Sequence, residues 1–168
     1  ALHFNGSDGY VTINDSGSLD YSDMVGATVS MWVYPERLDH DDEQTLYGHW
    51  SVTTSKRPFQ VMIDQENRWL VRTDHTDGLV VGPTAAINTW THVAAVWAPS
   101  GLTLYVNGVP VDVDGNVEAS LPANLATHTL GCRDKDGSLS QFFEGALDEV
   151  KIYDRALSPS EVADLASP

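Results

Sequence analysis

The sequence predicts an all-β fold in which two antiparallel sheets pack as a sandwich, with one short helix at the C-terminal end. Apolar and polar residues alternate with a period of two along most of the chain, and turn residues interrupt this alternation. The pair Asn107-Gly108 separates two alternating segments, which is a strong signal of a β-hairpin. Helical spacing occurs only near the end of the sequence. A chain built almost entirely of strands is most economically a two-sheet sandwich.

In the first half of the chain, short strands are expected between polar, glycine-bearing loops. Pro35 ends one of them, because proline cannot donate a hydrogen bond to a neighbouring strand. The sequence Asp-Gln-Glu-Asn at residues 64–67 predicts a turn between two others. The strands expected in this half lie at residues 1–4, 11–13, 29–34, 45–50, 57–64, 68–73 and 79–81.

The second half continues in the same way and then changes to a helical pattern. Strands are expected at residues 92–97, 102–106, 109–113 and, as the longest, roughly 142–153. The sequence Ser-Pro-Ser-Glu at residues 158–161 is typical of a capping box with proline in the first helical position. Val162 and Leu165 follow at helical spacing, so a short helix is predicted here.

Length, composition and charge limit the classes of protein that fit. The 168 residues, 42% of them hydrophobic, suit one globular domain, and no apolar run is long enough to span a membrane. A net charge of −15 argues against nucleic acid and anionic membranes as partners, because binding phosphates requires clustered Lys and Arg. The single cysteine, Cys132, excludes an internal disulfide and is expected to be buried. Because the chain opens directly into a strand without a signal peptide, we interpret residues 1–168 as one domain excised from a larger secreted protein.

Five segments of the sequence resemble the laminin-G-like domains of the concanavalin A-like lectin and glucanase superfamily. They are residues 2–11, 27–35, 90–97, 104–108 and 143–158. The resemblance covers nearly the whole chain and is weakest over residues 36–89. It implies a curved antiparallel jelly-roll sandwich, commonly with one structural calcium ion (Ca²⁺) and often with a role in glycan recognition.

The same resemblance implies where calcium would bind. Families of this kind place a calcium ligand at the acid that matches Asp148, beside the turn that follows the first strand. Here that turn offers Asn5, the Gly6 carbonyl and Asp8, and calcium accepts such carboxylate and carbonyl oxygens. If the last strand alternates regularly, Asp148 points into the core, where an isolated carboxylate is costly. The alternative is that Asp148 caps backbone amides of the adjacent turn.

Aromatic side chains are candidates for a platform on which a sugar ring could lie. Trp50 and Trp69 lie outside the segments that carry the resemblance, and either core packing or ligand contact suits them. Trp32, Trp90 and Trp97 fall within these segments, and core packing is the expected role of all three.

Basic residues form the second candidate feature, because several of their segments could converge on one sheet or its rim. The planar guanidinium of arginine suits a carboxylate, a sulfate or neighbouring hydroxyls of a sugar. The alternative is scattered surface charges paired with the abundant acids. The predicted ligand-binding residues are His49, Trp50, Arg57, Gln60, Arg72, Asp74, His75 and Arg133.

Catalysis has to be considered because the superfamily includes glycosidases and polysaccharide lyases. A retaining glycosidase needs two carboxyl groups about 5 Å apart, and no central strand has acids at alternate positions. Neither a Gly-x-Ser-x-Gly elbow nor a His-Glu-x-x-His motif occurs. A lyase site could still be assembled from the His, Arg and Gln residues of the predicted ligand set.

The function predicted from these observations is non-catalytic binding of a carbohydrate, as a lectin-like, secreted module. The expected partner is a glycan or polysaccharide, and the module is expected to be tethered to a catalytic or adhesive domain. Two alternatives remain open at this point. One is a protein-interaction or adhesion module of an extracellular protein, which an exposed apolar patch would favour. The other is a domain related to a polysaccharide lyase or glycosidase.

Overall fold

The computed structural model describes residues 1–14, 24–38, 42–51, 56–73, 78–117, 121 and 127–167. Its strands and helix are β1 (Leu2–Asn5), β2 (Val11–Ile13), β3 (Ala27–Pro35), β4 (Gln44–Ser51), β5 (Lys56–Ile63), β6 (Arg68–Arg72), β7 (Leu79–Thr84), β8 (Thr91–Ala98), β9 (Gly101–Val106), β10 (Val109–Asp114), β11 (His128–Leu130), β12 (Arg133–Lys135), β13 (Ser138–Ser140), β14 (Glu144–Tyr153) and α1 (Pro159–Leu165). The predicted strands and the C-terminal helix are confirmed.

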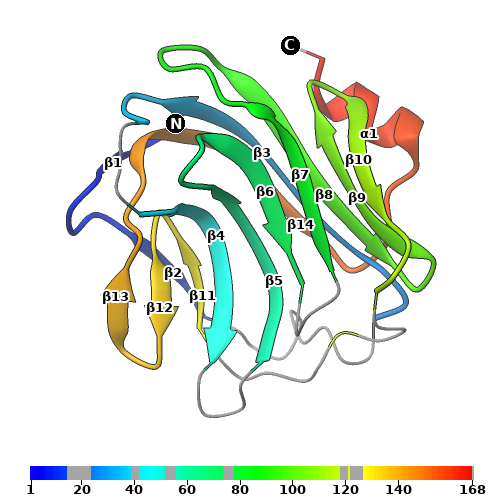
Figure 1. Ribbon diagram of the computed structural model, residues 1–168, viewed down its shortest axis with the longest axis horizontal. Coiled ribbons are helices and arrows are strands. Elements are labelled where there is room, and N and C mark those ends of the chain that lie inside the picture. Colours follow the sequence, from blue (N-terminus) through cyan, green and yellow to red (C-terminus); the bar gives the residue numbers. More distant parts are fainter. Residues whose placement is uncertain are drawn as a thin grey trace.

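The strands form a two-layer antiparallel sandwich, as predicted (Figure 1). The first sheet has the order β1-β14-β3-β8-β9-β10, and the second has the order β2-β11-β4-β5-β6-β7. The short strands β12 and β13 pair with each other. Figure 1 looks onto the second sheet, with the first sheet behind it and α1 beside β9 and β10. In the part of the chain that is described, no helix is long and apolar enough to cross a membrane.

The hydrophobic core lies between the two sheets and follows the alternation of the strands. On β5 and β6 its members are Phe59, Val61, Ile63, Trp69 and Val71, all at most 1% exposed. Because successive side chains of a strand point to opposite faces, the residues between them point away from the first sheet. We call this side of the second sheet its outer face.

Local turn chemistry is confirmed at two predicted places. Asn107 and Gly108 have φ angles of 50° and 77°, as a type I′ turn between β9 and β10 requires. At the helix, the Ser158 side chain accepts from the backbone of Glu161, and the Glu161 side chain accepts from the backbone of Ser158. Val162 of the helix packs on the outward side of the first sheet.

The last strand contains a β-bulge that the sequence pattern did not predict. The register of β14 against β3 shifts between Asp148 and Lys151, and Glu149 has a φ of 48°. A bulge inserts an extra residue and reverses the alternation beyond it. Leu147 therefore points inward before the bulge and Val150 points inward after it. The expectation that Asp148 points into the core is wrong: its side chain is 46% exposed.

Two of the three tryptophans expected in the core lie outside it. Trp97 is fully buried between the sheets, as expected. Trp90 is 40% exposed and contacts Tyr34, with the ring centroids 5.3 Å apart. Trp32 is half-buried and contacts the His92 ring. On β3 the inward positions are filled by valines and a methionine, so Trp32 points outward. Trp69, left open by the sequence, belongs to the core.

Side-chain carboxylates join the neighbouring edges of the two sheets. Asp112 on β10 accepts a hydrogen bond from the backbone N–H of Val81 on β7, at 2.8 Å. Asp114 accepts one from the backbone N–H of Leu79, at 3.2 Å. Edge strands carry unpaired N–H groups that need a partner or cover. These two contacts fix β7, which borders the candidate site.

Candidate functional site

One row of residues crosses the outer face of the second sheet. Each residue lies opposite the next in the strand register. In order from β11 to β7, the row consists of Thr129, Gly48, Gln60, Arg72 and Leu79. Two of the predicted ligand-binding residues, Gln60 and Arg72, are therefore direct neighbours on one face.

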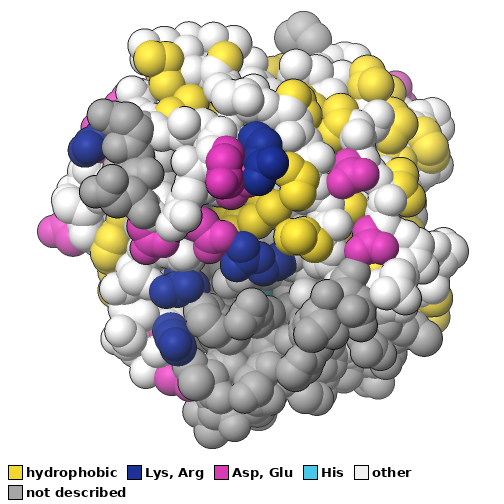
Figure 2. Space-filling view, viewed as in Figure 1, with side chains coloured by type: hydrophobic (Ala, Val, Ile, Leu, Met, Phe, Trp, Pro, Cys, Tyr) yellow, Lys and Arg dark blue, Asp and Glu magenta, His cyan; other side chains and the backbone are white. Residues whose placement is uncertain are grey.

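A more apolar row lies beside it. Thr45 faces Met62, Met62 faces Leu70, and Leu70 faces Val81 in the register. Figure 2 shows the result on this side of the molecule, where basic and acidic side chains surround a strip of apolar side chains. The outer face thus offers charged groups next to apolar surface.

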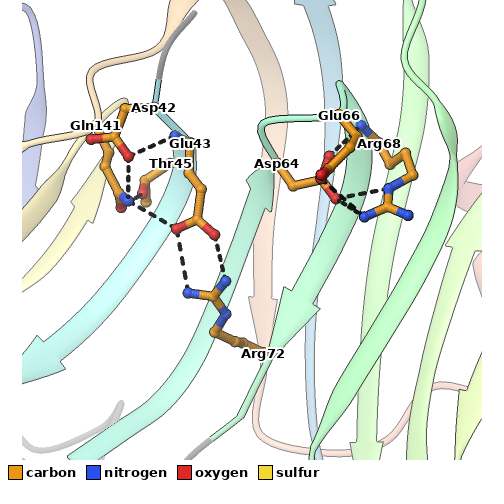
Figure 3. A network of polar contacts seen from close by, with 8 residues as sticks. All are labelled: Asp42, Glu43, Thr45, Asp64, Glu66, Arg68, Arg72 and Gln141. Carbon is orange, nitrogen blue, oxygen red and sulfur yellow. Dashed lines mark hydrogen bonds and ion pairs between the residues drawn. The ribbon is translucent and has the colours of Figure 1, made fainter.

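Arg72 forms a two-point ion pair with Glu43, drawn in Figure 3. Arg72 Nη2 lies 2.5 Å from Glu43 Oε1, and Arg72 Nη1 lies 3.3 Å from Glu43 Oε2. The side chains are 27% and 17% exposed, respectively. A charge-assisted pair with two hydrogen bonds is stronger and more directional than a single contact. The pair fixes the guanidinium in place.

Gln141 donates a hydrogen bond to the Glu43 carboxylate of this pair. Its side-chain Nε2 donates to Glu43 Oε2 at 2.9 Å, and its Oε1 accepts from the Thr45 hydroxyl at 3.2 Å. Gln141 is buried and has a φ of 55°, which is unusual for a residue other than glycine. Such backbone strain persists only where surrounding contacts fix it, and it is common at functional sites.

A second arginine pair lies on the other side of the apolar strip. Arg68 Nε donates to Asp64 Oδ2 at 2.9 Å, and its Nη2 donates to Glu66 at 3.1 Å. The hydrogen bond to Asp64 raises the pKa of the Arg68 guanidinium above its ordinary value. Together the two pairs border a hollow of about 200 Å³ whose apolar lining is Leu70, Leu79 and Val81.

Gln60 supplies an unpaired donor next to Arg72. The residue is 1% exposed, and its Nε2 has no hydrogen-bond partner in the structure as described. Burying an amide donor without a partner costs about 1–3 kcal/mol. A hydrogen-bond acceptor for the Gln60 Nε2 donor would remove this cost, and the described residues do not supply one.

The structure does not bring His49 to this face. His49 lies opposite Phe59 in the register, so it points between the sheets, where it is fully buried and stacks on His128 at 3.9 Å. The side chains of Trp50 and Arg57, and all of Asp74 and His75, lie outside the described residues.

Arg133 lies in β12, beside β4, and donates to the Ser140 hydroxyl at 3.1 Å. The thiol of the preceding Cys132 is buried, as expected, and burial raises its pKa to about 11.

Sequence reasoning missed several residues of the site. Arg68 could have been found, because it lies four positions before Arg72 on one strand and therefore faces the same way. Glu43 and Gln141 were not among the predicted site residues. Their separation of 98 positions in the sequence gave no signal that they meet.

The predicted calcium ligands lie at two separate places, the turn after β1 and the opposite end of that strand. Asn5 Oδ1 accepts hydrogen bonds from the backbone N–H groups of Ser7, Asp8 and Gly9, at 3.0–3.2 Å. Its Nδ2 donates to Asp8 Oδ1 at 2.7 Å. Asn5 and Asp8 are thus together, but the Asn5 side-chain oxygen is already occupied by three donors.

Asp148 is not beside this turn. In the register Leu2 faces Leu147 and Asn5 faces Glu144, so Asp148 lies near the opposite end of β1, about 13 Å along the strand from the position that faces Asn5. The Asp148 carboxylate accepts from the backbone N–H of Glu149 and lies 3.4 Å from the N-terminal ammonium. The four predicted ligands therefore do not fit a single calcium site. Within the described ranges, no group of three or more His, Cys, Asp or Glu residues could hold a metal ion.

A larger hollow of about 450 Å³ lies elsewhere, between β1, β2, β11 and β14. Its lining side chains are apolar except for Asp148 and Glu149. Sugar recognition needs several convergent polar groups in a largely apolar site. The outer face of the second sheet fits that requirement better.

Comparison with known proteins identifies a family and a relative of known sequence. The model of the family described as "Concanavalin A-like lectin/glucanases superfamily" matches residues 5–163. A stretch of 75 residues is 33% identical to the human Adhesion G-protein coupled receptor D1. That stretch is 44% of this chain and 9% of the receptor.

Solved structures from several kinds of protein share the fold at low sequence identity. A heptameric SAP-like pentraxin from Limulus polyphemus has a TM-score of 0.73 at 18% identity, over 98% of this chain and 80% of that one. A Trypanosoma rangeli sialidase, solved with the inhibitor DANA, has a TM-score of 0.75 at 17% identity, over 98% of this chain and 27% of that one. A candidate carbohydrate-binding protein from Bacteroides ovatus has a TM-score of 0.71 at 16% identity, over 96% of this chain and 47% of that one.

Proposed function

The chain belongs to the concanavalin A-like lectin/glucanases superfamily, and from this premise we propose that it is a non-catalytic carbohydrate-binding module with its sugar site on the outer face of the second sheet. The observation that supports this site most directly is the Arg72–Glu43 pair beside the apolar side chains that line the hollow. The similarity to a candidate carbohydrate-binding protein supports the ligand class.

The chemistry of the outer face suits a sugar. Each sugar hydroxyl both donates and accepts hydrogen bonds, and the C–H groups of the ring are apolar. Arg72 offers N–H donors, and Glu43 and Asp64 offer carboxylate acceptors. Leu70, Leu79 and Val81 provide apolar surface between them. The Gln60 amide lies next to Arg72 in the strand register, but it is 1% exposed and is not part of this exposed surface.

The same contacts support binding rather than catalysis. Glu43 and Asp64 are each paired with an arginine, and a glycosidase needs one uncharged carboxylic acid to protonate the leaving group. The sialidase match covers only 27% of that chain, so the activity of the whole protein gives no assignment for this module.

A protein-interaction or adhesion module is the second candidate, and the similarity to an adhesion receptor favours it. We further propose that the module acts outside the cell, joined to a catalytic or adhesive domain. The chain matches only 9% of that receptor and 27% of the sialidase, which supports a role within longer proteins.

Replacing Arg72 with methionine should weaken polysaccharide retention about tenfold or more, because the fixed guanidinium is the main donor group of the site. The measurement is affinity gel electrophoresis against a panel of polysaccharides. The panel should also be assayed after incubation for new reducing ends and unsaturated products, and none are expected.

Arg155→Met is the matched control. Arg155 forms the same two-point pair with Glu161, at 2.6 and 3.0 Å, but far from the second sheet beside α1. Its loss should leave retention unchanged. Equal retention by Arg72→Met and the wild-type protein would contradict the proposed site, and failure of the wild-type protein to bind any polysaccharide would favour the adhesion function.

We also propose one structural calcium ion, on the strength of the family resemblance, with ligands that do not include Asp148. A ligand at a hundred times its Kd stabilises a fold by about 2.7 kcal/mol. For a domain of this size, EDTA should therefore lower the melting temperature by about 5–10 °C relative to millimolar calcium. Asp148→Asn should show the same difference. Identical melting curves with EDTA and with calcium would refute calcium binding.

A further inference from the structure

We infer that this site selects neutral sugars and excludes anionic ones, because Glu43 already occupies the part of Arg72 that would bind an anion. The inference deepens the proposed function and rests on it. From the sequence alone, Arg72 suited a carboxylate or a sulfate as well as hydroxyls; the ion pair in the structure removes the first two.

The geometry of the pair is that of a bound carboxylate. Both Glu43 oxygens contact terminal nitrogens of Arg72, which is the two-point arrangement that an acidic ligand would use. A guanidinium has five N–H donors. Glu43 takes two of them, and the remaining donors can bond to hydroxyls one at a time.

Glu43 is also hard to displace. Its Oε2 accepts from Gln141 as well as from Arg72, and Gln141 is itself fixed by two hydrogen bonds to Thr45. An anionic ligand would have to break the hydrogen bonds of Glu43 to both Arg72 and Gln141. The displaced carboxylate, only 17% exposed, would then lie beside the ligand's own negative charge.

The surrounding charges act in the same direction. The charged side chains that line the hollow are three acids and two arginines (Figure 3): Glu43, Asp64, Glu66, Arg68 and Arg72. The remainder of the protein adds to a net charge of −15. Such a field lowers the local concentration of anionic ligands and slows their association.

The first test uses polysaccharides that differ only in charge. Suitable pairs are polygalacturonate with its carboxyl-reduced form, alginate with its carboxyl-reduced form, and a sulfated galactan with its desulfated form. We expect the wild-type protein to bind neutral members at least about tenfold more tightly than their acidic partners. Tighter binding of any acidic member would overturn the inference and leave carbohydrate binding intact. Failure to bind every member would remove both the proposed function and this inference.

The second test restores anion binding. In Glu43→Gln the Arg72 guanidinium loses its carboxylate partner while the shape of the side chain is kept. Affinity for the acidic polysaccharides should rise about tenfold or more and should fall again with added salt. Circular dichroism is the control for folding, and the spectrum of the variant should match that of the wild-type protein.

Glu161→Gln is the matched control, because it changes the net charge equally and frees Arg155 in the same way. It should not gain affinity for acidic polysaccharides. An equal gain in both variants, or none in Glu43→Gln, would show that the Arg72–Glu43 pair does not select against anions.

Discussion

Replacing Phe143 with alanine should lower the free energy of unfolding by about 3–5 kcal/mol, the usual cost of removing a buried phenylalanine ring. Phe143 is fully buried, and its ring lies 6.2 Å from that of Phe4 across the core. Its backbone N–H donates to Gly131, and its carbonyl accepts from Gly6. Because a domain is stable by only about 5–15 kcal/mol, the loss is a large fraction of the total.

The adjacent residue provides the control. Phe142 is only half-buried, so Phe142→Ala removes the same ring from a less enclosed place. Urea unfolding should place the two variants at least about 2 kcal/mol apart, with similar slopes against denaturant. Equal losses would mean that the Phe143 ring does not anchor residues 141–143. In that case the ring would not fix the position of Gln141 either.

The strands could be predicted from the sequence because burial on one face enforces a period of two. The hairpin at Asn107-Gly108 could also be predicted, since few residue pairs adopt positive φ at both central positions of a turn. The three-residue strands β11, β12 and β13 were missed because their sequences, His-Thr-Leu, Arg-Asp-Lys and Ser-Leu-Ser, lack the apolar–polar–apolar alternation of the equally short strand β2, Val-Thr-Ile. The bulge in β14 was missed because its positive φ falls on Glu149, a residue type that gives no signal for it.

The site was predictable only where neighbouring strands follow each other in the sequence. Gln60 and Arg72 meet because the turn at residues 64–67 sets the register of β5 against β6. Glu43 reaches Arg72 from 29 positions away, and Gln141 reaches Glu43 from 98. Contacts of that range depend on how the whole sandwich folds, so a local pattern cannot reveal them. They also change the chemistry, because a free arginine and an arginine held by a carboxylate attract different ligands.

Lowering the pH from 7 to 4 should destabilise the domain by up to about 3 kcal/mol through one buried histidine, His92. His92 is 1% exposed, its Nε2 shares a hydrogen bond of 2.8 Å with the Ser30 hydroxyl, and its ring contacts Trp32. Burial, and secondarily the positive charge of Lys151, lower the pKa of His92 to about 4, from 6.5 in the unfolded chain.

Acid lowers the free energy of unfolding because the unfolded chain binds the proton more tightly than the folded protein does. Between pH 6.5 and 4 the unfolded chain binds a proton at His92 and the folded protein does not, so acid favours unfolding. This contribution to stability is complete above pH 6.5 and is lost as the pH falls through that interval. Urea unfolding of the wild-type protein and His92→Asn at pH 7, 5.5 and 4.5 isolates the effect, because the other titrating groups are common to both. The free energies of unfolding should converge as the pH falls, because asparagine stays neutral, and a constant difference would show that His92 accepts a proton equally well in the folded protein.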